Sequence, residues 1–155
     1  MAVKLEDLIR KGGVFDKVEG TSSDQVYKEI VNLMSFSESI SKDEIYEALC
    51  AREKIMSTAV GNGIALPHCR IPIIKDMSDQ RIAIVYLKEP LAMNAPDGIP
   101  VNTMFVILAQ NQSDHIQMLS ALAGLLKENE FKKLLAGHAG EAEILNAVKE
   151  FAQNK

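Results

Sequence analysis

His68 is the first side chain that could take part in chemistry. It closes a run of small and apolar residues, STAVGNGIALPHCR, from position 57 to position 70. No aspartate or glutamate lies between Lys54 and Lys75, although the whole chain has a formal net charge of −4. Arg70 adds a further cation to this segment. Because like charges repel, these surroundings suit an anion better than a metal cation. Three options follow for His68: a buried structural residue, a metal ligand, or a nucleophile that faces an anion.

The structural option has the greater weight when His68 is considered alone. A single histidine beside apolar residues is more often buried and hydrogen-bonded than reactive. Upstream of it, Gly61, Asn62 and Gly63 could form a loop whose backbone N–H groups approach a phosphate closely. This pattern lacks the third glycine of a dinucleotide fingerprint and the Gly-Lys-Ser/Thr of a phosphate loop. We therefore predict a phosphate-binding loop over residues 61–63 that matches neither of these motifs.

Two further residues could share a site with His68. His115 follows Ser113, which we predict to cap the start of a helix, and a helix N-terminus attracts phosphate through its free N–H groups. The alternative is that His115 is an exposed residue of the first turn. Arg52 is expected at the end of a helix, where it could either stabilise the helix C-terminus or bind phosphate oxygens with its guanidinium group. His138, in the segment AGHAG, is expected to lie in a loop without a chemical role.

Metal binding and thiol chemistry are the competing explanations. His68, Cys69 and His115 could hold a metal, but adjacent residues rarely serve one ion together, and no C-x-x-C or H-E-x-x-H pattern is present. A cysteine protease would need Cys69 to meet His115, without any accompanying family signature. We expect Cys69 to fill tight space beside His68 and Cys50 to lie on the apolar face of a helix. We predict neither a metal nor a cofactor.

The composition is that of a single globular domain spanning residues 1–155. Apolar residues make up 47% and charged residues 25% of the chain. The net charge of −4 argues against a nucleic acid partner. No apolar stretch is long enough to span a bilayer, and the N-terminus, MAVKLEDLIRKGG, lacks the features of a secretory signal. Two cysteines do not make a disulfide framework, so we expect a cytoplasmic protein with reduced thiols and no membrane insertion.

Helical signals dominate the first third of the chain. Residues 4–13 read as a short helix stopped by two glycines, and residues 13–20 as a short strand. Ser22 with Gln25, and Ser41 with Glu44, have the spacing of capping boxes at the starts of two further helices.

Strand signals occupy the centre and helical signals return at the end. Residues 81–90 and 101–110 are rich in β-branched and apolar residues and predict buried strands, with a loop over residues 94–100 between them. After this region we predict a helix with one apolar face and two more helices, over residues 131–136 and 141–151. The apolar face of the first helix comprises Ile116, Leu119, Ala123 and Leu126. The fold class is therefore α/β, a single layered domain with a mixed β-sheet flanked by helices.

Two segments resemble a known family. REKIMSTAVGNGIALPHCR, residues 52–70, is similar to the phosphorylation-site motif of enzyme IIA domains of the bacterial phosphotransferase system, fructose/mannitol type. The apolar, glycine and proline positions fall in register with that motif. Residues 94–126, NAPDGIPVNTMFVILAQNQSDHIQMLSALAGLL, resemble the second half of the same domain. The resemblance covers almost the whole chain and points to the nitrogen-regulatory (PtsN-like) branch.

The resemblance implies a role for each candidate residue. His68 falls at the phosphorylated histidine, His115 at the second active-site histidine that supports the phosphoryl group, and Arg52 at an arginine near the site. Ala59 stands where glycine is usual, and an alanine there would be strained if the position required a positive φ. Cys69 stands where glycine is commonest. The implied fold is a mixed sheet sandwiched by helices.

The resemblance also implies partners. HPr, or its nitrogen-branch relative, would donate the phosphoryl group. The phosphorylated protein would then either switch its contacts with a regulatory target protein or pass phosphate to a IIB domain of a sugar transporter. The lack of a fused transport domain favours the regulatory function. Because no carboxylate lies near His68 in sequence, we expect no local general base to activate water, so that a phosphohistidine would persist.

Overall fold

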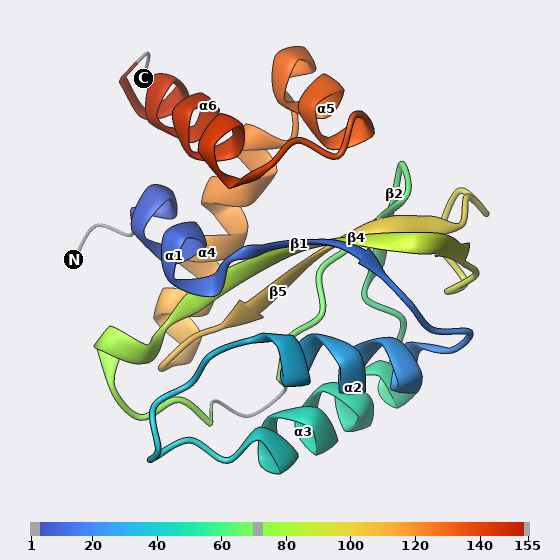
Figure 1. The fold of residues 1–155 in the computed structure, drawn as a ribbon, viewed down its shortest axis with the longest axis vertical. Helices are drawn as coiled ribbons and strands as arrows, with labels where there is room; N and C mark the ends of the chain where they lie inside the picture. The colour runs from blue at the N-terminus through green and yellow to red at the C-terminus, as the bar shows by residue number, and fades with distance from the viewer. Residues whose placement is uncertain (1–3, 70–72, 154–155) are drawn as a thin grey trace.

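The structure, a computed structural model, describes residues 4–69 and 73–153 and contains one mixed five-stranded sheet (Figure 1). Its strands are β1 (Val14–Val18), β2 (Ala59–Gly61), β3 (Ile64–Ala65), β4 (Arg81–Leu91) and β5 (Val101–Leu108). They lie in the order β1-β4-β5-β3-β2. The pairs β1–β4 and β3–β5 are parallel, whereas β4–β5 and β2–β3 are antiparallel. The predicted mixed sheet and the strands over residues 81–90 and 101–110 are therefore confirmed.

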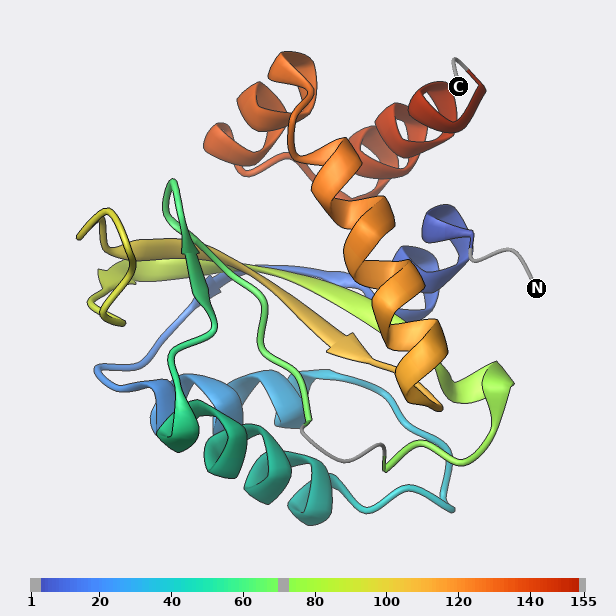
Figure 2. The ribbon, with the colours of Figure 1, turned by 180° about the vertical axis from the view of Figure 1, so that it is seen from behind.

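Helices cover both faces of the sheet (Figures 1 and 2). On one face lie α2 (Ser23–Leu33) and α3 (Lys42–Ile55); on the other lie α1 (Leu5–Gly12), α4 (Gln112–Leu125), α5 (Asn129–Ala136) and α6 (Glu141–Gln153). A short 3₁₀ helix, Met77–Asp79, precedes β4. The helices predicted over residues 131–136 and 141–151 are present, each about two residues longer.

The two central strands are apolar on both sides because both faces of the sheet are covered. In β4, Ala83 and Val85 pack with α2 and α3, whereas Ile82 and Ile84 pack with the helices of the opposite face. Side chains alternate across a strand, so a strand buried on both faces reads as a continuous apolar run. The two edge strands, β1 and β2, are shorter and irregular in register.

The predicted helix caps are right at two sites and wrong at a third. The side chains of Ser22 and Ser41 accept hydrogen bonds from the backbone N–H groups of Gln25 and Glu44, as their spacing predicts. The start of α4 is not capped by Ser113. Asn111 takes that place, with its side chain accepting from the N–H of Asp114 at 2.8 Å.

The predicted apolar face of α4 is half right, because Leu119 and Leu126 pack against the core but the other two residues do not. Ile116 is 56% exposed and Ala123 is exposed, whereas Met118, Leu122 and Leu125 are buried against the sheet. The sequence of α4 is apolar on more than one side, so helical spacing alone does not decide which side faces the core.

Close packing of α1 on β4 depends on Gly12. A Cβ atom built at this position would lie 2.0 Å from the backbone carbonyl oxygen of Ile82. Backbone cannot retreat as a flexible side chain can, so helix and strand must separate to admit any larger residue. Gly140, by contrast, has no heavy atom within 4 Å of such a Cβ.

We expect Gly12→Ala to lower the free energy of unfolding by about 2 kcal/mol or more, the cost of forcing atoms into a packed core. This outcome opposes helix propensity, which favours alanine over glycine by about 1 kcal/mol. Gly140→Ala is the matched control and should change stability by no more than about 0.5 kcal/mol. Urea unfolding of the three proteins measures the differences. Equal stability of the two variants would contradict the close approach of α1 and β4.

Candidate functional site

His68 is held at the end of the sheet by the strand that precedes it. The chain leaves β3 in an extended conformation, and the N–H of Ile107 donates to the carbonyl oxygen of Pro67 at 2.9 Å. His68 itself forms an isolated parallel bridge with Ile107 of β5. The proline before it restricts the backbone further. The imidazole is therefore carried on a backbone that the sheet fixes in place.

One ring nitrogen of His68 has a defined partner. Nδ1 lies 2.8 Å from the carbonyl oxygen of Leu66, and a carbonyl oxygen can only accept a hydrogen bond. Nδ1 must therefore carry the proton, which leaves the lone pair of the neutral ring on Nε2. Burial lowers the pKa of His68; the positive charge of Arg52 also lowers it, while the hydrogen bond to Leu66 and the negative charge of Glu53 act in the opposite direction.

His115 reaches the same place from α4. The centroids of the two imidazole rings lie 4.7 Å apart, with their planes inclined at 39°. Burial lowers the pKa of His115 to about 4, helped by the charges of His68 and Arg52. Both rings are therefore neutral at pH 7. The backbone N–H of His115 donates to the carbonyl oxygen of Asn111 at 3.0 Å, so only the side chain of His115 is available to a ligand.

Arg52 supplies the positive charge near both rings. It lies in the last turn of α3 and its Nη1 donates to the carbonyl oxygen of Met56 at 2.6 Å. This contact is the helix-end role considered from the sequence. A guanidinium group has five N–H donors, so one such bond leaves others for an anion. The structure thus brings Arg52, His68 and His115 together from α3, the end of the β3 extension and α4.

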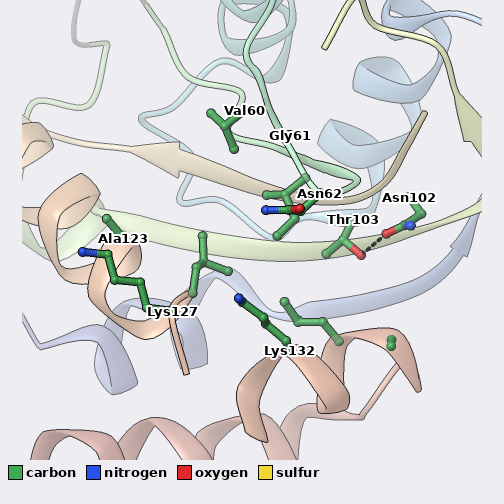
Figure 3. A pocket seen from close by; sticks show the side chains of 12 residues that line it. Val60, Gly61, Asn62, Asn102, Thr103, Ala123, Lys127 and Lys132 are labelled. Atoms are coloured by element: carbon green, nitrogen blue, oxygen red, sulfur yellow. Dashed lines mark hydrogen bonds between the residues drawn. The ribbon is translucent and has the colours of Figure 1, made fainter. Parts of the chain in front are cut away.

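The loop of Gly61, Asn62 and Gly63 lies elsewhere. It forms the tip of the β2–β3 hairpin, where all three residues have positive φ values of 104°, 57° and 78°. The N–H of Asn62 already donates to a carboxylate oxygen of Asp97 at 2.7 Å. Gly61 and Asn62 line a separate cavity, whose walls include neither histidine (Figure 3). The predicted phosphate-binding loop is therefore not assembled with His68.

Glu53 is a residue that the sequence analysis missed. Its two carboxylate oxygens accept hydrogen bonds from the Tyr27 hydroxyl, from the Thr58 hydroxyl at 2.7 Å and from the Thr58 N–H at 2.9 Å. The carboxylate also acts electrostatically on His68, so this histidine does have a carboxylate nearby. The sequence feature that could have identified Glu53 is its position directly after Arg52, at the end of α3.

Two residues near His68, Ala59 and Cys69, have defined surroundings. Ala59 lies within β2, is buried and pairs with Ala65, and it is not among the described residues with positive φ, so no strain arises there. Burial raises the pKa of the Cys69 thiol to about 12, so this thiol is protonated at neutral pH and is a poor nucleophile. Cys69 packs against the core on the α2 and α3 side of the sheet and borders a small cavity together with Ile107 and His115. Arg70 lies outside the described residues.

Residues 4–69 and 73–153 contain neither a metal-binding cluster nor a membrane-spanning helix. In this part of the chain, no group of three or more His, Cys, Asp or Glu side chains is arranged to hold a metal ion. None of the helices described there has both the length and the apolar character needed to cross a membrane.

Comparisons with known proteins agree on one family. The model for the EIIA 2 domain of the phosphoenolpyruvate-dependent sugar phosphotransferase system matches residues 7–151. A nitrogen regulatory protein of Pseudomonas aeruginosa is 32% identical over 155 residues, covering 98% of each chain. The fructose-specific EIIABC component of Bacillus subtilis is 27% identical over 149 residues, which cover 94% of this chain and 23% of that protein.

A solved structure shares the fold. The crystal structure of the nitrogen regulatory protein IIA-Ntr from Neisseria meningitidis superimposes with a TM-score of 0.78 at 28% sequence identity. The superposition covers 92% of this chain and 97% of that one.

We expect the imidazole of His115 to titrate with a midpoint of about 4, and that of His68 below 6.5. Histidine chemical shifts measured by NMR between pH 3 and pH 9 test this directly. A midpoint for His115 at or above 6.5 would show that the two rings are not desolvated together.

The same shift predicts a stability change. Between pH 6.5 and about 4, unfolded His115 binds a proton that the folded protein does not, so the free energy of unfolding falls as the pH falls through this window. His115→Gln should lose less stability than the wild type across the same interval. Parallel losses in the two proteins would contradict a lowered pKa.

Glu53→Gln should destabilise the protein by about 1–3 kcal/mol, because it weakens hydrogen bonds to a charged acceptor that is half-buried. Glu47→Gln, on the exposed side of the same helix, is the control and should stay within about 0.5 kcal/mol of the wild type. Denaturant unfolding provides both values. If the two variants are equally stable, Glu53 does not join α3 to the segment before β2.

Proposed function

The chain belongs to the EIIA 2 family of the phosphoenolpyruvate-dependent sugar phosphotransferase system, and from this premise we propose that it carries a phosphoryl group on Nε2 of His68. The observation that supports this most directly is the hydrogen bond between His68 Nδ1 and the carbonyl oxygen of Leu66. It directs the free lone pair to Nε2. The lowered pKa keeps the ring unprotonated and therefore nucleophilic at neutral pH.

The proposed reaction is phosphoryl transfer between two histidines. Nε2 of His68 attacks the phosphorus of a phosphohistidine on a donor protein of the HPr type, or its nitrogen-branch relative. A new N–P bond forms as the donor's N–P bond breaks, and the donor imidazole leaves with its lone pair, neutral when its other nitrogen carries a proton. The proton on Nδ1 stays beside Leu66, whose carbonyl oxygen stabilises the positive charge that develops on the His68 ring.

Arg52 and His115 are the proposed partners of the phosphoryl oxygens. The transferred group carries negative charge on three oxygens, and fixed donors that face this charge lower the barrier. The Arg52 guanidinium contributes a full positive charge. His115 contributes a ring N–H. A dianion bound beside it favours the imidazolium form and therefore promotes protonation of His115.

Glu53 is proposed to position the site rather than to act as a base. Its oxygens accept hydrogen bonds from Tyr27 and Thr58. Both carboxylate oxygens already accept hydrogen bonds, so a water molecule near His68 would have to displace one of these donors to reach them. From the sequence, we explained a long-lived phosphohistidine by the absence of a carboxylate near His68. We now propose that the hydrogen bonds to Glu53 explain it instead.

We favour regulation over sugar transport as the use of the phosphoryl group. The P. aeruginosa relative, which matches over almost its whole length, is named as a nitrogen regulatory protein, as is the N. meningitidis structure. A phosphoryl group adds a charge of about −1.5 to −2 and can create or abolish a docking contact with a target protein. The alternative is transfer to a fructose/mannitol-type IIB domain, which the match to a fructose-specific component supports.

Labelling with phosphoenolpyruvate, enzyme I and HPr tests the proposal. We expect the wild type to accept one phosphoryl group and His68→Ala to accept none. His115→Ala should still be labelled, at a rate about 10–100 times lower, since a hydrogen bond to a charged group contributes about 1.5–3 kcal/mol. The labelling rate is followed by phosphate-affinity electrophoresis.

His138→Ala is the matched control, because this exposed histidine pairs with Asp16 on another part of the surface and should leave labelling unchanged. Equal labelling of the wild type and His68→Ala would disprove the assignment of the acceptor. Addition of a purified IIB domain separates the two uses: rapid loss of the label to IIB supports transport, whereas retention supports regulation.

A further inference from the structure

The cavity that Gly61 and Asn62 line lies away from the histidine pair. It has a volume of about 450 Å³ and is enclosed by the tip of the β2–β3 hairpin, the start of β5, the end of α4 and one side of α5 (Figure 3). In Figure 2 the hairpin rises from the edge of the sheet toward α5, which forms the facing wall. This volume falls within the range of about 300–1,000 Å³ that is typical of sites for small ligands.

The ionisable side chains that line this cavity are basic. Among the described residues they are Lys127, just beyond α4, and Lys132, on α5. Within residues 4–69 and 73–153, no carboxylate forms an ion pair with either lysine. The nearby Glu130 instead pairs with Lys133, at 3.7 Å. An acidic protein thus presents two lysines, neither paired with a described carboxylate, to one hollow.

The opposite wall offers amide groups. The buried hydroxyl of Thr103 donates to Oδ1 of Asn102 at 2.8 Å, which occupies the acceptor of that amide and leaves its NH₂ group as a donor. The side chain of Asn62 lies above the cavity at the hairpin tip (Figure 3). Donors on one wall and ammonium groups on the other both complement an anion.

Apolar side chains complete the lining. Val60 is 51% exposed on the hairpin, and Ile64, Leu126 and Leu135 also border the cavity. An exposed branched apolar residue beside lysines would contact the carbon skeleton of a ligand rather than its charged group.

The hairpin wall is formed before any ligand arrives. Asp97 accepts hydrogen bonds from the N–H groups of Asn62 and Ile99 and so ties the tip to the loop that precedes β5. Gly63 has a φ of 78°, which side-chain-bearing residues rarely adopt, so the turn at the hairpin tip favours glycine there. A cavity with fixed walls binds without a large cost of ordering.

We propose that this cavity binds a small organic anion, with a phosphate or carboxylate group between Lys127 and Lys132 and a compact apolar body against Val60 and Leu126. This site is separate from the phosphoryl-carrying histidine and does not depend on it.

Phenyl phosphate is a suitable probe because it combines a phosphate group with a compact apolar ring. Benzoate tests whether a carboxylate can replace the phosphate. Inorganic phosphate tests the anion without an apolar body, and benzyl alcohol tests the apolar body without an anion. Titration of the ¹⁵N-labelled full chain should shift the amide signals of Asn62, Asn102 and Lys132 in a saturable manner. The dissociation constant should rise at least tenfold in the Lys127→Gln/Lys132→Gln variant. Benzyl alcohol should bind at least tenfold more weakly than phenyl phosphate.

Lys133→Gln is the matched control, because this lysine is exposed on the same helix and does not line the cavity. Its affinity for phenyl phosphate should stay within twofold of the wild type, as should that of His68→Gln. Equal affinities in the double variant and in Lys133→Gln would overturn the proposal. Shifts centred on Cys69 and His115 that vanish in His68→Gln would assign the anion to the histidine site instead. Phosphoryl labelling of His68 is a separate measurement, so either proposal can fail alone.

Discussion

The hydrogen bond from Nδ1 of His68 to the carbonyl oxygen of Leu66 depends on how the chain leaves β3. The two groups lie only two residues apart, so the bond depends on the backbone conformation between them. Pro67 limits that backbone, and its carbonyl oxygen is bound to the N–H of Ile107. Ile107 lies in β5, one of the two strands that the helices bury from both sides. The tautomer of one imidazole is thus tied to the core of the whole sheet.

Desolvation gives the histidine pair its chemical character. Two imidazoles and a guanidinium group converge with limited access to water, and of the three only the guanidinium carries a charge at neutral pH. The nearest carboxylate is bound by Tyr27 and Thr58. The site therefore favours the binding of an anion. The guanidinium group of Arg52 and protonation of the His115 ring would both stabilise an incoming dianion.

Local signals in the sequence predicted local structure well. Ser22 and Ser41 act within one helical turn, so their spacing alone identified two caps, and the apolar runs of β4 and β5 reported a sheet covered on both faces. The start of α4 was missed because Asn111 competes with Ser113 as a cap. Its buried face was predicted only in part, at Leu119 and Leu126, because that helix is apolar on several sides. Glu53 was missed because its partner Tyr27 lies on another helix, 26 residues away in the chain. The position of residues 61–63 depends on Asp97, and that contact appears only after folding.

The outer strands of the sheet have a consequence for how copies of this protein meet one another. Exposed strand edges offer unpaired N–H and C=O groups to other chains and are the usual starting points of aggregation. Here the edges are the five residues of β1, whose register breaks near Lys17, and the three residues of β2, which twist into a hairpin with positive φ values. Neither edge offers a long, flat template. Strand-to-strand pairing between copies through these two edges is therefore limited to a few residues.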